Sequence, residues 1–233
     1  MKFRFIICTV LLALNLANAQ EEESVQEPFF GTDSLYVEDQ FYIGATYNIM
    51  FNRPKSVSQR NLSNGIFVGY IKDIPINKKR NKAIGIGLGY SVNTYFDEIK
   101  ITRQGDEVTY ALIDQDINFS KNKIITHIAE LPIEYRWRTS SPEKYVFWRI
   151  YTGVKLGYVF SDIYKFESDT EKLRFSNPNF NQFQYGVTLS VGYNTWNVHA
   201  YYGLNTLFDN AVLNDGSSID TRDFKLGIMF YIL

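Results

Sequence analysis

The two histidines, His127 and His199, are the first residues to weigh for chemistry. Acyl transfer or hydrolysis would need a histidine beside a nucleophile and an acid. The local sequences read His127-Ile-Ala and His199-Ala-Tyr, so neither histidine sits in a His-x-Ser pair. If His199 and Ser190 lie on neighbouring strands and face the same side, a hidden pair stays open, although a buried, hydrogen-bonded histidine is the commoner outcome. We predict no catalytic constellation, and therefore no enzyme.

Metal and cofactor sites are not expected either. Two histidines far apart in sequence do not form a ligand cluster. The single cysteine, Cys8, lies near the N-terminus in a segment that we expect to be removed. The remaining chain would then have no thiol, no disulfide and no cysteine-based metal site.

Glutamate, arginine and lysine residues alternate with apolar residues in two neighbouring stretches of the chain. Over 130–138, Leu131, Ile133, Tyr135 and Trp137 share one face, and over 145–160 a second apolar face alternates with charges and glycines. Period-two alternation is typical of β-strands. The polar face carries the candidate interior charge cluster, which consists of Glu130, Glu134, Arg149, Lys155 and, from the last strand, Lys225. We interpret this cluster as a packed, mutually neutralised core; a pore or proton path is the alternative.

The strand that begins near Tyr145 is too long for an ordinary soluble sheet. Strands of soluble proteins have about five or six residues, whereas a strand that crosses a bilayer needs roughly 9–11 and carries an apolar band between aromatic girdles. Thr139–Lys144 has turn chemistry, so the two stretches predict a hairpin. If it turns between Ser141 and Pro142, Glu134 faces Arg149 across the strands.

The same pattern recurs along the chain and predicts eight strands. Besides the two above, they are expected at 40–50, 65–74, 83–95, 183–194, 197–208 and 225–233. Strand 65–74 is ambiguous because Phe67 and Ile71 compete with Ile66, Val68 and Tyr70 for the outer face. In strand 83–95, Gly85, Gly87 and Gly89 point inward, which indicates a crowded interior and not a phosphate-binding loop.

The connections alternate in length. Those after the first, third, fifth and seventh strands are long and polar, including 97–121 and 168–181, and those after the second, fourth and sixth are short. Outer-membrane barrels have this arrangement, with short periplasmic turns and long extracellular loops. The predicted fold is therefore an eight-stranded, antiparallel, up-and-down transmembrane β-barrel over 39–233. A soluble β-sandwich is the alternative fold. We do not expect a diffusion porin, because it needs about sixteen strands.

The N-terminus predicts the route to that membrane. Residues 1–19 combine Lys2 and Arg4, an apolar run and the Ala17-Asn-Ala19 cleavage motif of a secretory signal peptide. Residues 20–38 form an acidic segment expected in the periplasm. Loss of the leader removes Lys2 and Arg4 from 24 basic residues and leaves 22 against 25 acidic ones, so no basic surface for nucleic acid is indicated.

The last strand resembles the C-terminal signal that the barrel assembly machinery reads. Lys225, Gly227, Phe230 and Ile232 fit its polar, glycine and hydrophobic positions, whereas the final residue is Leu233 and not an aromatic. The predicted location is the outer membrane of a Gram-negative bacterium, with that machinery and the membrane lipid as partners.

Three stretches carry a family resemblance: Glu134-Tyr-Arg-Trp-Arg138, Pro142-Glu-Lys-Tyr145 and Phe147-Trp-Arg-Ile-Tyr-Thr-Gly153. In these the chain resembles the PorT-like, or porin-like, outer-membrane barrels of Bacteroidota. The resemblance implies an accessory role in type IX protein secretion and gliding, with secretion components as partners, but no binding residue can be carried over. We expect a monomeric barrel with a structural or accessory role in export or envelope assembly. A lipid-modifying enzyme and a small-solute channel are the alternatives.

Overall fold

The computed structural model describes residues 40–59, 62–105, 107–114, 116–139 and 148–232. The predicted leader, the acidic segment 20–38, the turn at Ser141 and Pro142, the start of the fifth strand at 145–147, and Leu233 lie outside these residues. Within the described ranges, no helix is long and apolar enough to span a membrane.

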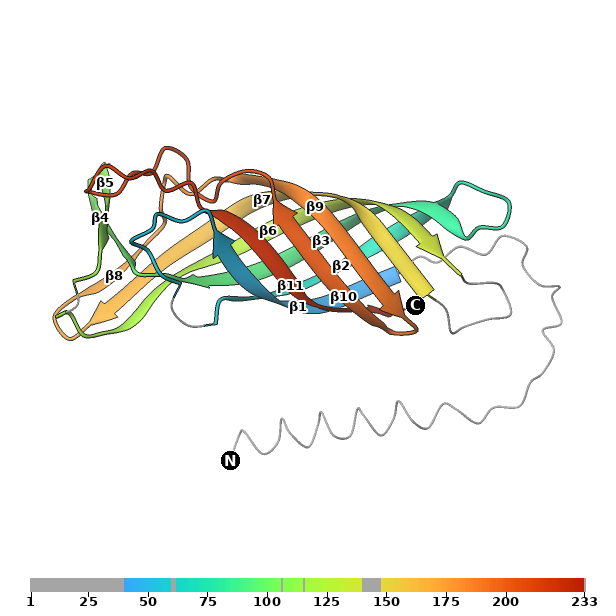
Figure 1. Cartoon of the computed structure of the whole chain (residues 1–233), viewed down its shortest axis with the longest axis horizontal. Coiled ribbons are helices and arrows are strands. Elements are labelled where there is room, and N and C mark those ends of the chain that lie inside the picture. Colours follow the sequence, from blue (N-terminus) through green and yellow to red (C-terminus); the bar gives the residue numbers. More distant parts are fainter. Residues whose placement is uncertain (1–39, 60–61, 106, 115, 140–147, 233) are drawn as a thin grey trace, which may run out of the picture. The chain divides into compact units, whose positions relative to one another are not determined.

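Eight antiparallel strands close into a barrel, as the sequence predicts. Each strand pairs with the next, and the last pairs with the first, so the sheet leaves no free edge to be satisfied in lipid. Figure 1 shows these strands running obliquely around a common axis. They are β1 (Gln40–Phe51), β2 (Asn64–Pro75), β3 (Lys82–Phe96), β6 (Phe119–Arg138), β7 (Trp148–Ser168), β9 (Phe183–Tyr193), β10 (Trp196–Gly203) and β11 (Arg222–Ile232).

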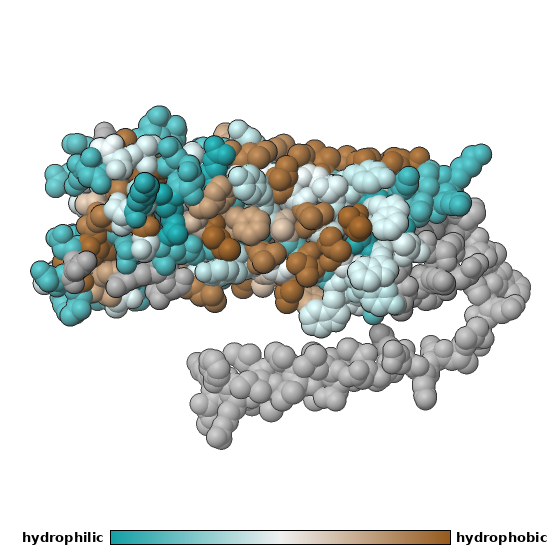
Figure 2. Space-filling model, viewed as in Figure 1, coloured by the Kyte–Doolittle hydropathy of each residue, from teal (hydrophilic) through white to brown (hydrophobic). Residues whose placement is uncertain are grey.

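Successive residues of each strand point alternately into the barrel and towards the lipid. In β1 and β9 buried and exposed residues alternate almost without a break. β2 resolves the sequence ambiguity, because Phe67 and Ile71 are buried whereas Ile66, Val68 and Tyr70 are exposed. Figure 2 shows the outward side chains as a brown and pale band between hydrophilic ends.

Outward aromatic side chains gather near both ends of the barrel, as in membrane barrels. Near the short turns, the ring centroids are 5.1 Å apart for Trp148 and Tyr193 and 4.8 Å apart for Trp196 and Phe230. Near the long loops, Phe51 stacks on Tyr202 at 5.0 Å. Part of the high aromatic content, 16% of the residues, therefore forms two girdles.

The long loops all leave one end of the barrel, which we call the loop end; the short turns lie at the other, the turn end (Figure 1). The loop after β3 contains a hairpin formed by β4 (Ile99–Gln104) and β5 (Glu107–Leu112). The loop after β7 contains β8 (Lys172–Phe175), which pairs with β7. This short strand was not predicted.

Several strand boundaries differ from the prediction, including the start of β11, which lies at Arg222 and not at Lys225. β6 and β7 have 20 and 21 residues and extend far beyond the lipid-crossing part, because their loop-end halves pack against other loops instead of lipid. β6 begins at Phe119, inside the stretch predicted as loop. β10 ends at Gly203, five residues before the expected Phe208, and the following residues turn over the barrel.

The predicted pairing of Glu134 with Arg149 is wrong. Glu134 lies opposite Gly153, and Arg149 lies opposite Arg138. β6 ends at Arg138 and β7 begins at Trp148, and the partner of Glu134 lies four residues further along β7 than predicted. An even shift leaves every side chain on its predicted face, which is why the faces were right although the register was not.

The inward glycines make room for large side chains from other strands, as expected. A Cβ atom on Gly89 would lie 2.3 Å from the Tyr42 hydroxyl, and one on Gly85 would lie 2.6 Å from Cδ of Arg136. Gly69 lies opposite both Tyr42 and Gly89, so a row of two glycines accommodates one tyrosine.

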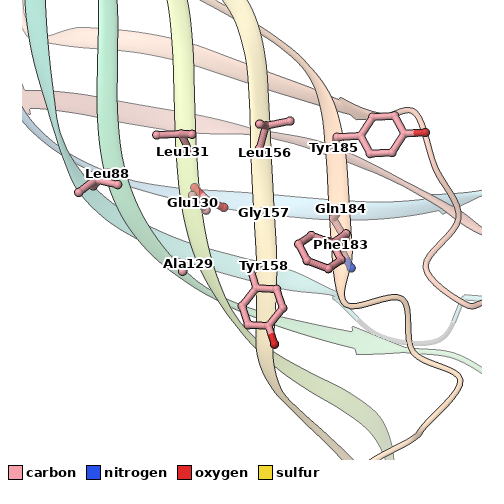
Figure 3. A pocket seen from close by; sticks show the side chains of 10 residues that line it. All are labelled: Leu88, Ala129, Glu130, Leu131, Leu156, Gly157, Tyr158, Phe183, Gln184 and Tyr185. Atoms are coloured by element: carbon pink, nitrogen blue, oxygen red, sulfur yellow. The ribbon is translucent and has the colours of Figure 1, made fainter.

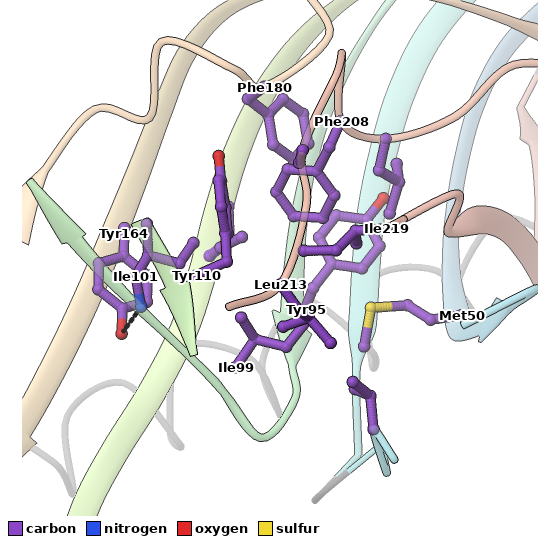
Figure 4. Packing of buried hydrophobic residues seen from close by; sticks show 14 of the residues in the cluster. Met50, Tyr95, Ile99, Ile101, Tyr110, Tyr164, Phe180, Phe208, Leu213 and Ile219 are labelled. Carbon is purple, nitrogen blue, oxygen red and sulfur yellow. Dashed lines mark hydrogen bonds between the residues drawn. The ribbon is translucent and has the colours of Figure 1, made fainter. Parts of the chain in front are cut away.

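Two apolar clusters occupy the interior. One lies within the barrel and consists of Tyr42, Phe67, Ile71, Tyr151, Met229 and Tyr231. The other fills the loop end and joins strand residues to loop residues such as Phe180 and Phe208, whose rings meet edge to face at 5.5 Å (Figure 4). We call the described residues of loops 52–63, 97–118, 169–182 and 204–221 the loop cap.

Candidate functional site

Charged side chains fill the barrel in two layers, and the predicted cluster is divided between them. The layer nearer the loop cap contains Glu130, Lys155 and Lys225. Lys155 Nζ lies 3.0 Å from Glu130 Oε2, and Lys225 Nζ lies 3.2 Å from Asp223 Oδ2. Two acids and two lysines therefore balance one another, as a buried group of charges requires.

Hydrogen bonds from uncharged side chains complete the layer nearer the loop cap, which we call the upper layer. Ser91 donates to Glu130 at 2.8 Å, and the Tyr95 hydroxyl donates to Asp223 at 2.7 Å. Asn48 donates to Asn93 at 3.1 Å. The ammonium of Lys155 also lies 5.2 Å from the ring centroid of Phe67, so both apolar and polar contacts fix its position.

The layer at the turn end is built around Asp73. One carboxylate oxygen accepts from Arg136 and the other from Arg138, and all three side chains are at most 1% exposed. Arg136 also donates to Gln40 and lies 4.0 Å from the ring centroid of Tyr151. A planar guanidinium suits such contacts, because its nitrogens donate to two different partners while its face stacks on an aromatic ring.

The other two predicted members join this lower layer. Glu134 Oε2 lies 3.8 Å from Arg136 Nε. Arg149 donates to the carbonyl oxygen of Asn194 at 2.6 Å, in the tight turn between β9 and β10. Glu134 and Arg149 thus share a layer without the direct pairing that was predicted.

Four members of the two layers were missing from the predicted cluster: Asp73, Arg136, Arg138 and Asp223. Arg136 and Arg138 are even-numbered, like Glu134, and therefore share its strand face. The alternation alone could have added both arginines to the predicted charge cluster. Asp73 lay in the strand whose faces were ambiguous. Asp223 precedes the predicted start of the last strand at Lys225.

The loop cap contains a buried acid, Asp97, at the junction of β3 and the β4–β5 hairpin. Its Oδ1 accepts from the Ile99 amide at 3.1 Å and from Asn122 at 3.3 Å. Burial raises the pKa of Asp97 to about 7, although the Ile99 amide and the charge of Arg53 oppose this shift. The charge of this carboxyl therefore changes near neutral pH.

Ser190 and His199 meet across β9 and β10. Ser190 Oγ lies 2.8 Å from His199 Nδ1, and both residues are 1% exposed inside the barrel. The other ring nitrogen, Nε2, has no hydrogen-bond partner among the described residues, so no acid orients the ring as in a catalytic triad. His127 lies instead on the outer wall, 2.6 Å from the Tyr90 hydroxyl.

The proposed assembly signal lies on the strand that closes the barrel. Lys225 and Gly227 are on the inner face of β11, and Phe230 and Ile232 are on the outer face. β11 pairs with β1 along its whole length.

The comparisons with known proteins agree with this architecture. Residues 18–209 match the family model of the outer membrane protein β-barrel domain. No curated protein matches the chain.

Two solved structures are distantly similar. Ail, the attachment invasion locus protein of Yersinia pestis, is 13% identical, with a TM-score of 0.37, and the match covers 85% of this chain and all of Ail. The same protein in complex with the heparin analogue sucrose octasulfate gives 14% identity, a TM-score of 0.38 and the same coverage. The family match covers most of the chain, and the chain therefore belongs to the outer membrane protein β-barrel domain family and resides in the outer membrane.

Proposed function

We propose that this protein is a non-conducting structural component of the outer membrane, whose loop cap binds a partner in protein export or envelope assembly. The observation that carries the proposal is the filled interior beneath an ordered cap. Side chains of eight strands can fill such a narrow barrel, and here two ion-pair layers and two apolar clusters do so.

The cap supports a binding role because it has a core of its own. Loops of outer-membrane barrels face the exterior. Here 17 buried apolar residues, counted over the described strands and loops, fix the loops to one another. Ordered loops lose little conformational entropy on binding, which favours affinity. The resemblance to PorT-like barrels supports type IX secretion as the pathway.

The test uses single cysteines as crosslinking sites. In a C8S background, a photocrosslinker is attached to D169C in the loop cap or to K79C in the turn-end connection; both residues are exposed. Crosslinked complexes are purified from native outer membranes and identified by mass spectrometry. We expect stoichiometric secretion or barrel-assembly subunits on D169C and fewer on K79C.

Two results would contradict the proposal. Recovery of the barrel alone from mild detergent, with no crosslinked subunit, would exclude a stable complex. Crosslinks confined to K79C would move the contact to the turn end.

The enzyme alternative has one supporting contact, between Ser190 and His199. Because both side chains are buried inside the barrel, we expect S190A and H199A to leave the lipid A composition of the cells unchanged. Loss of a lipid A modification in both variants, with normal amounts of folded barrel, would instead favour the enzyme.

A further inference from the structure

Three cations lie side by side on the outer wall at the loop end. Lys123 is directly opposite Lys165 across β6 and β7, and Lys165 is directly opposite Arg174 across β7 and β8. None of these three forms an ion pair with a carboxylate of the described residues; Lys123 lies 5.7 Å from the ring centroid of Phe96. Like charges directly opposite one another destabilise a sheet. A bound anion would offset the repulsion within this basic row.

The next row of side chains towards the loops, formed by Lys121, Glu167 and Lys172, does not supply a free carboxylate for the basic row. Glu167 lies 2.5 Å from Lys121 and 2.9 Å from Lys172, so two lysines share one carboxylate and positive charge is again in excess. Lys121 and Lys123 face away from the barrel in the regular alternation of β6, and Lys165 and Glu167 do so on β7 because a β-bulge follows Val159. Phe160 is skipped in the pairing, and beyond it the odd-numbered residues of β7 point outward while Tyr164 and Phe166 point in.

Along the same strands, towards the turn end, the wall is hollowed. An apolar groove of about 310 Å³ lies over Ala129 and Gly157, where small residues leave the wall thin (Figure 3). Pro132 cannot donate a ladder hydrogen bond, and the β3–β6 pairing omits Gly87 and Leu88 opposite Leu131 and Pro132. The groove walls are formed by Leu88, Leu131, Leu156, Tyr158, Phe183 and Tyr185.

The difference in depth between the basic row and the groove matches the thickness of one lipid leaflet. Six residues of β6 separate Lys123 from Ala129, about 20 Å along a strand. With a tilt of about 40°, the groove floor lies about 15 Å deeper than the row, which is half of the hydrocarbon core of about 30 Å. Between them, Tyr90, His127 and Phe160 form an aromatic group with centroid distances of 6.1 Å.

We propose that this wall binds a phosphorylated glycolipid of the outer leaflet. Its phosphate would lie on the row formed by Lys123, Lys165 and Arg174, and one acyl chain would lie in the groove over Ala129. The loop end faces the outer leaflet, where the anionic lipid is a glycolipid and not a phospholipid. This site depends on the membrane location of the barrel and not on the proposed export role.

The test is binding of bisphosphorylated lipid A to the detergent-purified full-length protein, measured by native mass spectrometry. K123Q/K165Q/R174Q removes the charges and A129L fills the groove. K78Q/K79Q in the turn-end connection and A45L on the outward face of β1 are the matched controls. We expect one lipid per barrel. Binding should be at least tenfold weaker in the charge variant, since the loss of even one bond to a charged group costs more than the 1.4 kcal/mol that equals a factor of ten. In A129L it should be several-fold weaker.

Three results would overturn the proposal. The first is lipid A binding by the charge variant that equals that of K78Q/K79Q. The second is equal effects of A129L and A45L. The third is equal competition by phosphatidylglycerol or by dephosphorylated lipid A, which would show that any lipid fills this wall. Each variant changes an exposed or lipid-facing residue, and the gel mobility shift on heating checks that it has folded.

Discussion

Tyr42 shows how single residues determine the packing of this barrel. Its ring reaches from β1 across Gly69 to Gly89, and a Cβ atom at either glycine would lie 2.3 Å from its hydroxyl oxygen. That hydroxyl has no hydrogen-bond partner among the described residues. Glycine in a strand is costly by itself, so the cost is offset by the burial of a large aromatic ring.

This contact predicts a coupled pair of substitutions. G89A should lower the free energy of unfolding by about 1–3 kcal/mol, because the methyl group overpacks against the Tyr42 hydroxyl. Y42F should have a small effect, because it removes an unpaired group, and G89A/Y42F should recover most of the loss. Urea unfolding from lipid vesicles gives the three values. If G89A costs as much in the Y42F background as in the wild type, this packing is contradicted.

At the scale of elements, the β4–β5 hairpin is held to the barrel by polar contacts as well as apolar ones. Asn122 on β6 donates to the carbonyl oxygens of Asp97 at 3.0 Å and Ile99 at 2.9 Å. The Ile101 amide donates to the hydroxyl of Tyr164 on β7 at 3.1 Å. The Asp97 carboxyl lies in the same junction, so its protonation state affects how the hairpin packs.

The stability of the hairpin should therefore depend on pH. The pKa of Asp97 is about 7, above its ordinary value of 3.8, so the folded cap holds the proton more tightly than the unfolded loop. This contribution is complete below about pH 4 and is lost as pH rises through about 7. We expect amide protection in residues 97–118 to fall between pH 5 and pH 8, after correction for intrinsic exchange rates.

The D97N variant is the control for this pH dependence. Its amide oxygen can still accept from Ile99 and Asn122, but the side chain does not titrate, so protection should stay constant between pH 5 and pH 8. Over this pH range the upper limit of the effect is about 3 kcal/mol, since about two pH units separate pH 5 from the pKa of Asp97 and each corresponds to about 1.4 kcal/mol. Equal pH dependence in D97N and the wild type would exclude Asp97 as the cause.

At the scale of the whole barrel, the interior combines separate barriers to ion passage. The lower layer around Asp73, the cluster that includes Phe67, the upper layer around Glu130 and the apolar core of the cap follow one another from the turn end to the loop end. Breaking a buried ion pair costs about 3–5 kcal/mol, so ions would not displace these pairs readily.

We therefore expect no unit conductance in planar bilayers. A porin of about sixteen strands serves as the positive control. F180A/F208A, which removes two rings from the cap core, should remain closed because both charged layers persist beneath it. Discrete conductance steps from the wild-type barrel would contradict the sealed interior and favour the channel alternative.

The sequence by itself determined the strand type, the inward and outward faces and the alternation of long and short connections. These properties are local, because period-two alternation and turn chemistry are written in consecutive residues. They were sufficient to predict a closed eight-stranded barrel, and to place Glu130, Glu134, Arg149, Lys155 and Lys225 on the inner face of the strands.

Only the tertiary structure decided which inward residues meet. Register between β6 and β7 depends on the length of their connection, so the Glu134–Arg149 pairing was mispredicted. The Asp73 contacts with Arg136 and Arg138 join residues more than sixty positions apart, and the bulge at Phe160 arises from pairing between strands. Such contacts are set by register, closure and packing across the barrel, which no local pattern encodes.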